Sequence, residues 1–199
     1  MNQTDISSPE TDNESSGQSA STTASSLPTQ IKVDPDKAFT ADGLIISPLM
    51  ELQPDWIDYN GHLNMAYYNV LFDRGCDVAF ELMGMGPDYA ATRRKTFYTA
   101  EIHVRYLREL HLGHRVQATV QIIDFDEKRL HIYQELRHED GWVSATSEGM
   151  ALHVDMTGPK VAPFADDVYA NIQDIVARQV SLPLPEGAGR RIEIKRKTA

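Results

Sequence analysis

Apolar and polar positions follow two different periods along the chain, and the change between them predicts the order of helices and strands. Within residues 64–84, apolar side chains recur every three or four positions, which is the spacing of one face of a helix. The positions on this face are Met65, Tyr68, Phe72, Cys76, Ala79 and Met83. Gly84, Gly86 and Pro87 follow and end the predicted helix.

After the helix the period changes from 3.6 to 2, which predicts β-strands. Apolar and polar residues alternate in segments 96–109 and 114–126, and two further strands are predicted at 129–138 and 141–154. Residues 139–141, Glu-Asp-Gly, form a turn sequence between the last two. Four consecutive strands of this kind are expected to pair as an antiparallel meander.

The remaining patterned segments complete the predicted domain. Residues 43–53 read as a strand, residues 87–94 as one or two helical turns, and residues 165–179 as an amphipathic helix. One long helix with an antiparallel sheet of about five strands wrapped round it is an α+β arrangement. The sequence therefore predicts a single α+β domain, bounded by residues 39 and 180, with a C-terminal extension at 181–199.

The first 38 residues differ in composition from the rest. Residues 1–30 are dominated by Ser, Thr, Asn and Gln, contain four acidic residues, and contain no Lys or Arg. Such a segment buries too little apolar surface to offset the entropy of ordering it, so residues 1–38 are predicted to be a disordered acidic tail. It has neither a basic start with an apolar run nor an Arg-rich composition, so a cytoplasmic location is the default expectation.

Charge and composition exclude several classes of function. The formal net charge of −10 argues against a nucleic-acid partner, which would require a basic face. No apolar run approaches eighteen residues, so no membrane span is predicted. The single cysteine, Cys76, cannot form an internal disulfide or a thiolate zinc site.

A polar motif lies directly ahead of the predicted helix. Asp58, Asn60 and His62 occupy alternate positions, and Gly61 separates the last two. Asp and Asn are favoured helix caps and turn residues, so Asp58, Asn60 and Asn64 can be explained by the satisfaction of backbone donors alone. A cap does not need a histidine, however, and the same motif is suited to a reaction centre.

This motif and the element order resemble the hotdog fold, specifically the acyl-CoA thioesterases of the 4-hydroxybenzoyl-CoA type, over roughly residues 43–155. "DYNGHLNMAYY" at 58–68 carries the resemblance, and "YTAEIHVRYLREL" at 98–110, followed by Gly113, is a second similar segment. Asp58 stands where that family keeps its catalytic aspartate. Asp58, Asn60 and His62 are also similar to the Asp-x-Asn-x-His set of plant-type acyl-carrier-protein thioesterases. The family pairs two subunits edge to edge, which implies a homodimer or a dimer of dimers.

The implied activity is hydrolysis of an acyl-CoA thioester to the free acid and coenzyme A. Asp58 would attack the carbonyl or deprotonate a water molecule, and the two roles remain open. His62 and Asn60 would orient that water. Backbone N–H groups of residues 61–64, at the helix N-terminus, would stabilise the oxyanion, and Gly61 would let the substrate approach the backbone. Coenzyme A enters only as part of the substrate, and no other cofactor is expected.

Further segments are similar to the betainyl-CoA thioesterase units of bacterial carnitine breakdown, which release betaine. They are "DEKRLHIYQELRHEDG" at 126–141, "ALHVD" at 151–155 and "GRRIEIKRK" at 189–197. Aromatic residues gather near the motif at Trp56, Tyr59, Tyr67, Tyr68, Phe97 and Tyr98. With Glu101 they can form a cage for a quaternary ammonium group, or they can simply pack in the core. The predicted substrate-binding residues are Gly61, Leu63, Asn64, Tyr67, Glu101 and Trp56.

Two other functions fit the same fold. Hotdog enoyl-CoA hydratases and dehydratases place the histidine five residues after the aspartate with a proline between, whereas here the spacing is four and Gly61 takes that place. This favours hydrolysis over hydration. A non-catalytic acyl-CoA-binding module would make Asp58 dispensable. No metal is expected, because the other histidines lack ligand spacing: His103, His111, His114, His131, His138 and His153. Ser144, Thr146 and Ser147 lack a nucleophile-elbow pattern.

Overall fold

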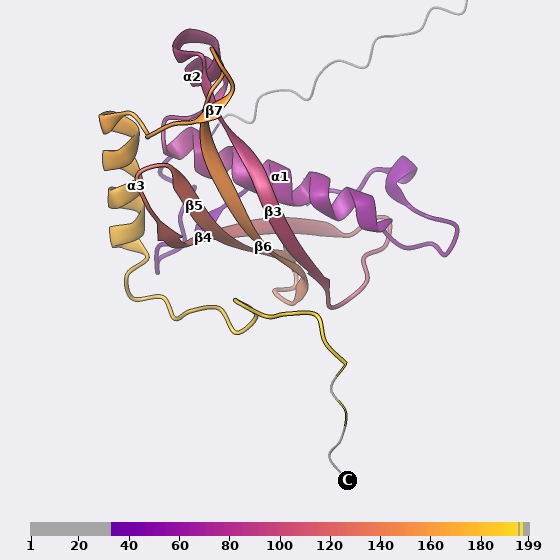
Figure 1. Cartoon of the computed structure of the whole chain (residues 1–199). Helices are drawn as coiled ribbons and strands as arrows, with labels where there is room; N and C mark the ends of the chain where they lie inside the picture. The colour runs from indigo at the N-terminus through magenta and orange to yellow at the C-terminus, as the bar shows by residue number, and fades with distance from the viewer. Residues whose placement is uncertain (1–32, 195, 197–199) are drawn as a thin grey trace, which may run out of the picture. The chain divides into compact units, whose positions relative to one another are not determined.

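The computed structural model describes residues 33–194 and residue 196. The predicted disordered segment up to residue 32 lies outside the described residues. Figure 1 shows the long helix α1 lying against a strongly curved antiparallel sheet, with α3 beside one end of that sheet. The α+β hotdog architecture predicted from the sequence is confirmed. None of the described helices is long and apolar enough to span a bilayer.

Helix α1 runs from Met65 to Leu82 and supplies the centre of the core. Its buried residues are Tyr68, Leu71, Phe72, Gly75, Val78, Ala79 and Phe80. The predicted face was wrong at Met65, which is the first residue of the helix and is 65% exposed. Cys76 is only partly buried, and Met83 is fully buried just after the helix.

Four long strands form most of the sheet. They are β3 (Lys95–Tyr106), β4 (Arg115–Phe125), β5 (Arg129–His138) and β6 (Val143–Asp155). The order is β1-β4-β5-β6-β3, so β3 pairs with β6 and not with β4. The predicted meander therefore holds for β4, β5 and β6 and was wrong for β3. The alternation of apolar and polar residues along a strand predicts which face of the strand is buried. It does not predict which strand lies beside it.

The short elements explain the remaining differences from prediction. The strand expected at 43–53 is two strands, β1 (Ile45–Ile46) and β2 (Met50–Glu51), and both pair with β4. Pro48 lies between them and lacks the N–H that a continuous ladder requires. A short 3-10 helix, η1 (Pro54–Trp56), leads to the polar motif, and β7 (Lys160–Val161) pairs antiparallel with the end of β6.

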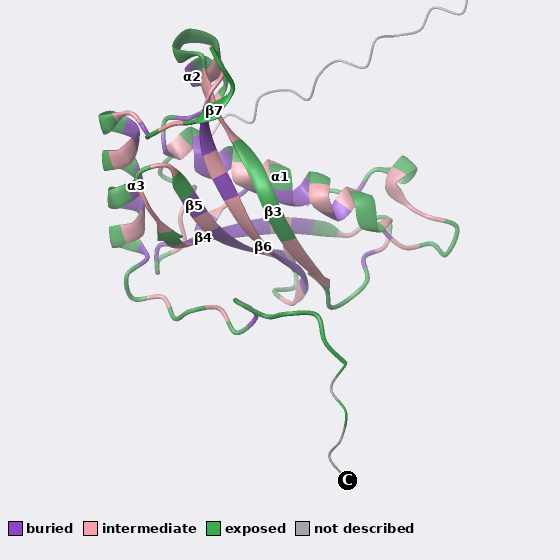
Figure 2. Cartoon of the chain, viewed as in Figure 1, coloured by how far each residue is buried: buried purple, intermediate pink, exposed green. Residues whose placement is uncertain are grey.

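The two shorter helices occur where the sequence predicted helical turns. They are α2 (Pro87–Arg93) and α3 (Asp166–Arg178). Helix α3 buries Val168, Ile172 and Ile175 in the same core cluster as Val78 and Phe80 of α1. Helices α1 and α3 therefore bury their apolar faces in the same core. Figure 2 shows buried residues on the inner side of α3 and along the middle strands.

The folded domain extends further in both directions than predicted. Ala38 is 4% exposed within the core cluster, its carbonyl accepts a hydrogen bond from the Ile46 amide, and Val33 packs against the same cluster. The predicted boundary between residues 38 and 39 was therefore wrong. At the other end, the Gly189 amide donates to the Glu148 carboxylate on β6, and the Pro183 carbonyl accepts from Gln121 on β4. The C-terminal extension therefore contacts the sheet.

Candidate active site

The polar motif forms a tight turn between η1 and α1. The Asp58 amide donates to the His62 carbonyl over 2.8 Å, and the Gly61 amide donates to the Asp58 carbonyl over 3.0 Å. Ile57 and Leu63 form an antiparallel bridge outside this pair. Gly61 has a φ of +80°, a conformation that residues with a side chain rarely adopt. The sequence therefore forms a small hairpin that brings Asp58 and His62 together.

Asp58 and Asn64 hold this region in different ways. Oδ1 of Asp58 accepts hydrogen bonds from the amides of Asn60 (2.8 Å) and His62 (3.3 Å), so one carboxylate oxygen is anchored within the turn. Helix α1 is capped by Asn64, whose Oδ1 accepts from the Ala66 amide over 3.0 Å. Asp58 is thus a turn residue rather than the cap of α1. The capping role considered for Asn64 is confirmed.

The backbone donors expected to stabilise an oxyanion are already used. The amides of residues 61–64 all donate within the protein, so the prediction that they remain unpaired was wrong. Their acceptors are the Asp58 carbonyl, Asp58 Oδ1, the Leu110 carbonyl and the Trp56 carbonyl, in that order. The next amide, at Met65, is the first of the helix and has no helical partner. Met65 also lines the hollow beside Asp58.

The loop after β3 closes this hollow from the other side. Leu110 is fully buried, and its carbonyl accepts from the Leu63 amide over 2.8 Å. Nδ1 of His111 lies 3.1 Å from the Gly61 carbonyl, which can only accept, so the imidazole donates. The amides of Leu107 and Arg108 donate to the Ser144 carbonyl on β6. The loop is therefore fixed both to the sheet and to the turn that carries Asp58.

We refer to the space between turn and loop as the polar hollow. Its volume is about 370 Å³, and its wall includes Asp58, His62, Met65, Tyr68, Tyr106 and Glu109. Leu63 and Asn64, both predicted to bind substrate, also line it. Asn60 and Gly61 are exposed on the outer side of the turn. Two of the three predicted catalytic residues, Asp58 and His62, therefore line the hollow.

One group at the rim of this hollow was not foreseen from the sequence. Glu109 lies between two imidazoles, with Oε2 3.8 Å from Nε2 of His62 and Oε1 3.5 Å from Nε2 of His111. The donor atoms of the three residues lie within 4.8 Å of one another. Two histidines and a carboxylate are a ligand set that can hold a divalent ion such as zinc. Sequence spacing gave no sign of it, because His62 precedes α1 whereas Glu109 and His111 follow β3.

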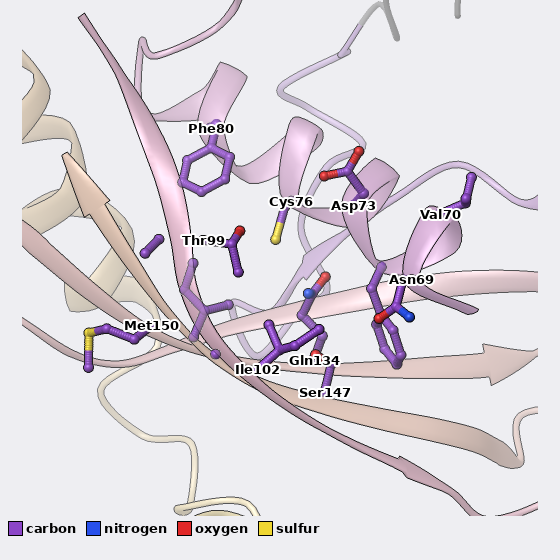
Figure 3. Close-up of a pocket in the computed structure, with 14 residues that line it drawn as sticks. Asn69, Val70, Asp73, Cys76, Phe80, Thr99, Ile102, Gln134, Ser147 and Met150 are labelled. Atoms are coloured by element: carbon purple, nitrogen blue, oxygen red, sulfur yellow. The ribbon is translucent and has the colours of Figure 1, made fainter. Parts of the chain in front are cut away.

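A second space, the apolar hollow, has a volume of about 380 Å³ and lies between α1 and strands β3, β5 and β6 (Figure 3). Cys76 points into it from α1, and burial raises the pKa of its thiol to about 12. A thiol of this kind stays protonated and is a poor nucleophile, as expected for a packing residue. Among the described residues, Asp73 is the one carboxylate on its wall, and partial burial raises its pKa.

The predicted ammonium cage does not form as a set in the described chain, because Tyr68 lines the polar hollow and the other five aromatic residues do not. Trp56 stacks on Tyr67 with ring centres 5.4 Å apart, and the Arg74 guanidinium lies 5.2 Å from the Trp56 ring centre. A protein cation therefore already occupies a place over this ring. Phe97 stacks on Phe80, and Tyr59 is 97% exposed. These residues serve packing or point outward.

Trp56, Tyr67 and Glu101 line neither the polar nor the apolar hollow. Glu101 stands exposed on β3 at a bulge, opposite Met150. Gly61 does not line them either, so four of the six predicted substrate-binding residues lie away from both hollows.

A sheet wrapped round one helix, with an acidic turn and a polar hollow at the start of that helix, defines a thioesterase of the hotdog class. A comparison with family models agrees, since residues 52–172 match the model described as the thioesterase-like superfamily. The chain belongs to the thioesterase-like superfamily and is a thioester hydrolase.

Individual relatives and solved structures give the same class. A betainyl-CoA thioesterase of Pseudomonas aeruginosa is 37% identical over 138 residues, which cover 69% of this chain and 87% of the relative. A candidate thioesterase of Pseudomonas putida KT2440 is 34% identical with a TM-score of 0.68, covering 77% of this chain and 98% of that one. A Staphylococcus aureus protein solved in complex with CoA has 28% identity and a TM-score of 0.72, covering 76% and 96%.

A fused relative matches over a smaller share of its own length. The L-carnitine dehydrogenase/betainyl-CoA thioesterase of Rhizobium meliloti is 34% identical over 163 residues, which cover 81% of this chain but 33% of the relative. This chain therefore corresponds to one part of that protein.

Proposed function

We propose that this protein hydrolyses betainyl-CoA to betaine and coenzyme A in the cytoplasm. The observation that carries the proposal is the position of Asp58, an anchored carboxylate at the wall of a hollow that is also lined by Met65, the first residue of α1. The substrate is supported by the 37% identity with a relative of that name. The reaction needs only water as co-substrate.

The residues of the polar hollow divide the chemistry between them. Anchoring of Oδ1 by two amides leaves the other oxygen of Asp58 free to attack the thioester carbonyl or to take a proton from water. The Met65 amide, at the positive end of the helix dipole, would stabilise the negative charge that develops on the carbonyl oxygen. His62 would orient the water. If Asp58 attacks, the carbon–sulfur bond breaks to leave an acyl–Asp58 anhydride, which water then hydrolyses to the free acid. If Asp58 acts as the base, the activated water displaces the thiolate directly. In both routes the coenzyme A thiolate takes up a proton.

We further propose that the active form is a symmetric homodimer, or a dimer of dimers, paired through β3. Among the described residues β3 has a strand neighbour on one side only. Three large side chains on it are about half exposed: Tyr98 (51%), Ile102 (49%) and Tyr106 (45%). An unpaired apolar edge strand is a template for a second copy. Light scattering on the active protein tests this, and a strictly monomeric active species would contradict it.

The variant Asp58→Asn tests the catalytic assignment. Asparagine keeps an oxygen acceptor for the amides of Asn60 and His62, so the turn and the stability should be preserved. Turnover of betainyl-CoA should nevertheless fall by about two orders of magnitude or more, because the amide is neither a base nor a nucleophile. Asp55→Asn, an exposed acid-to-amide change in η1, is the matched control and should retain turnover.

The readout separates an enzyme from a binding module. Release of coenzyme A is followed with a thiol reagent, and unfolding is followed by circular dichroism. A folded Asp58→Asn protein that still binds betainyl-CoA but barely hydrolyses it supports the proposal. Turnover within about threefold of the parent would reduce Asp58 to a turn residue.

A further inference from the structure

We propose that Glu109, together with the rings of Tyr68 and Tyr106, forms the subsite for the quaternary ammonium group of the acyl chain. All three residues line the polar hollow beside Asp58. The inference rests on the proposed function, and it names the residues that recognise the cationic end of that substrate.

The short acyl chain decides which hollow receives the cation. One methylene carbon joins the nitrogen to the thioester carbon in a betainyl group, so the two atoms are about 2.5 Å apart. If the thioester lies at Asp58 and Met65, the ammonium group must lie in the same hollow. Asp73, the carboxylate of the apolar hollow, is eight residues further along α1 than Met65, or about 12 Å along the helix axis. It is too far away to meet the cation.

Glu109 places a carboxylate at the wall of the polar hollow, beside Asp58. Among the described residues its ion-pair neighbours are His62 at 3.8 Å and His111 at 3.5 Å. Neither imidazole forms a hydrogen bond with Glu109 at these distances, so the carboxylate keeps its oxygen atoms available at the rim of the hollow. A quaternary ammonium group has no N–H to donate, so it pairs well with a carboxylate that is close but not hydrogen-bonded.

Two aromatic rings complete the subsite. Tyr68 and Tyr106 meet edge to face with centres 5.0 Å apart, and the Tyr106 hydroxyl reaches the Met65 carbonyl over 3.4 Å. Tyrosine faces attract quaternary ammonium groups through their π electrons. Arg108 also lines the hollow, but its guanidinium lies 4.0 Å from the centre of the Trp142 ring, which holds its charge against that indole.

The competing occupant is a divalent metal held by His62, Glu109 and His111. A metal ion there would place positive charge beside the ammonium group, so the two occupants exclude each other. The experiment must therefore distinguish an organic cation from a metal cation.

Two esters of the same shape test the inference. Betainyl-CoA carries the cation, and 3,3-dimethylbutyryl-CoA replaces the nitrogen with carbon. Glu109→Gln should lower kcat/KM for the cationic ester by about tenfold, because a charge contact worth roughly 1–2 kcal/mol is lost. The neutral ester should change by less than about threefold. Tyr106→Leu should show the same selectivity, and Glu51→Gln, an exposed acid-to-amide change on β2, should alter neither ester.

Binding of the two esters to Asp58→Asn, with and without Glu109→Gln, provides a readout that does not require turnover. A loss of affinity for the cationic ester alone supports the subsite even if the parent hydrolyses neither ester, an outcome that would refute the proposed function. Equal losses for both esters would overturn the subsite. So would a Co²⁺ absorption spectrum in the parent that Glu109→Gln abolishes, together with loss of both activities after chelation.

Discussion

The imidazole of His111 donates from Nδ1 to the carbonyl oxygen of Gly61 over 3.1 Å, which joins the loop after β3 to the turn that carries Asp58. Together with the bond from the Leu63 amide to the Leu110 carbonyl, it fixes the two walls of the polar hollow relative to each other. The position of Asp58 therefore depends on a residue that is far away in the sequence.

Removal of this bond should impair turnover more than folding. His111→Leu leaves the Gly61 carbonyl without its donor and loosens the turn, so kcat should fall by about tenfold, since small misplacements of a catalytic group are costly. His111→Asn supplies an amide donor at a similar distance and should recover part of the loss. Steady-state kinetics on both variants checks this. An equal loss of kcat in the two would show that the hydrogen bond does not position Asp58.

His62 should matter less than Asp58. Its side chain lines the hollow 3.8 Å from Glu109, where it can orient a water molecule but is not required to attack the substrate. His62→Ala should lower kcat by roughly tenfold, clearly less than Asp58→Asn. The measurement is turnover of one ester by both variants at saturating substrate. A larger loss for His62→Ala would make the histidine the principal base.

Two N-terminal truncations should separate the acidic segment from the folded domain. Deletion of residues 1–30 removes only the Ser- and Thr-rich stretch, and we expect Tm to be unchanged. Deletion of residues 1–38 also removes Val33 and the buried Ala38. The loss of this packing should lower Tm by roughly 5 °C. Thermal unfolding of the two proteins side by side checks the boundary, and identical Tm values would show that residues 31–38 add nothing.

Gly75 should not tolerate even a methyl group. A Cβ there would lie 2.6 Å from the Ala118 Cβ and 2.9 Å from Oε1 of Gln134, and Ala118 can move only with its strand. Gly75→Ala should therefore destabilise the fold by about 1–2 kcal/mol, despite the better helix propensity of alanine. At Gly158 an added Cβ meets nothing within 4 Å, so Gly158→Ala is the matched control. Urea denaturation measures both, and equal stability of the two variants would contradict the close approach.

Stability should fall as the pH drops below neutrality because of His153. This residue is fully buried, with Nδ1 2.7 Å from the Ala162 carbonyl and Nε2 2.9 Å from the Tyr89 hydroxyl, and burial lowers its pKa below the ordinary 6.5. Between that lowered pKa and 6.5, the unfolded chain binds more protons than the folded one. Stability is therefore lost as pH falls through this window.

Thermal unfolding from pH 7.5 to pH 5 tests the role of His153. The parent should lose Tm more steeply than His153→Gln, which cannot titrate. Parallel curves would assign the pH dependence to other groups.

Local patterns were sufficient to predict the long helix, the four long strands and the position of the polar motif. The spacing of apolar residues has a period of 3.6 in the helix over residues 64–84 and a period of 2 in the strands after residue 95. These periods follow from backbone geometry alone. The motif from Asp58 to His62 could be found because its residues are adjacent in the chain. The capping role of Asn64 was likewise a local signal, since a cap acts within its own turn.

Contacts between distant segments were decided only by the tertiary structure. The hydrophobic period does not predict that β3 pairs with β6 rather than with β4. It also does not predict that Arg74, rather than a ligand, lies over the Trp56 ring. Both depend on packing between distant segments. The same is true of Glu109 and His111, which reach His62 only because the loop after β3 folds back onto the turn. Periodicity shows which face of an element is buried. The element against which that face packs depends on the shape and polarity of residues far away in the chain. For this reason the wall of the site was determined only by the tertiary structure.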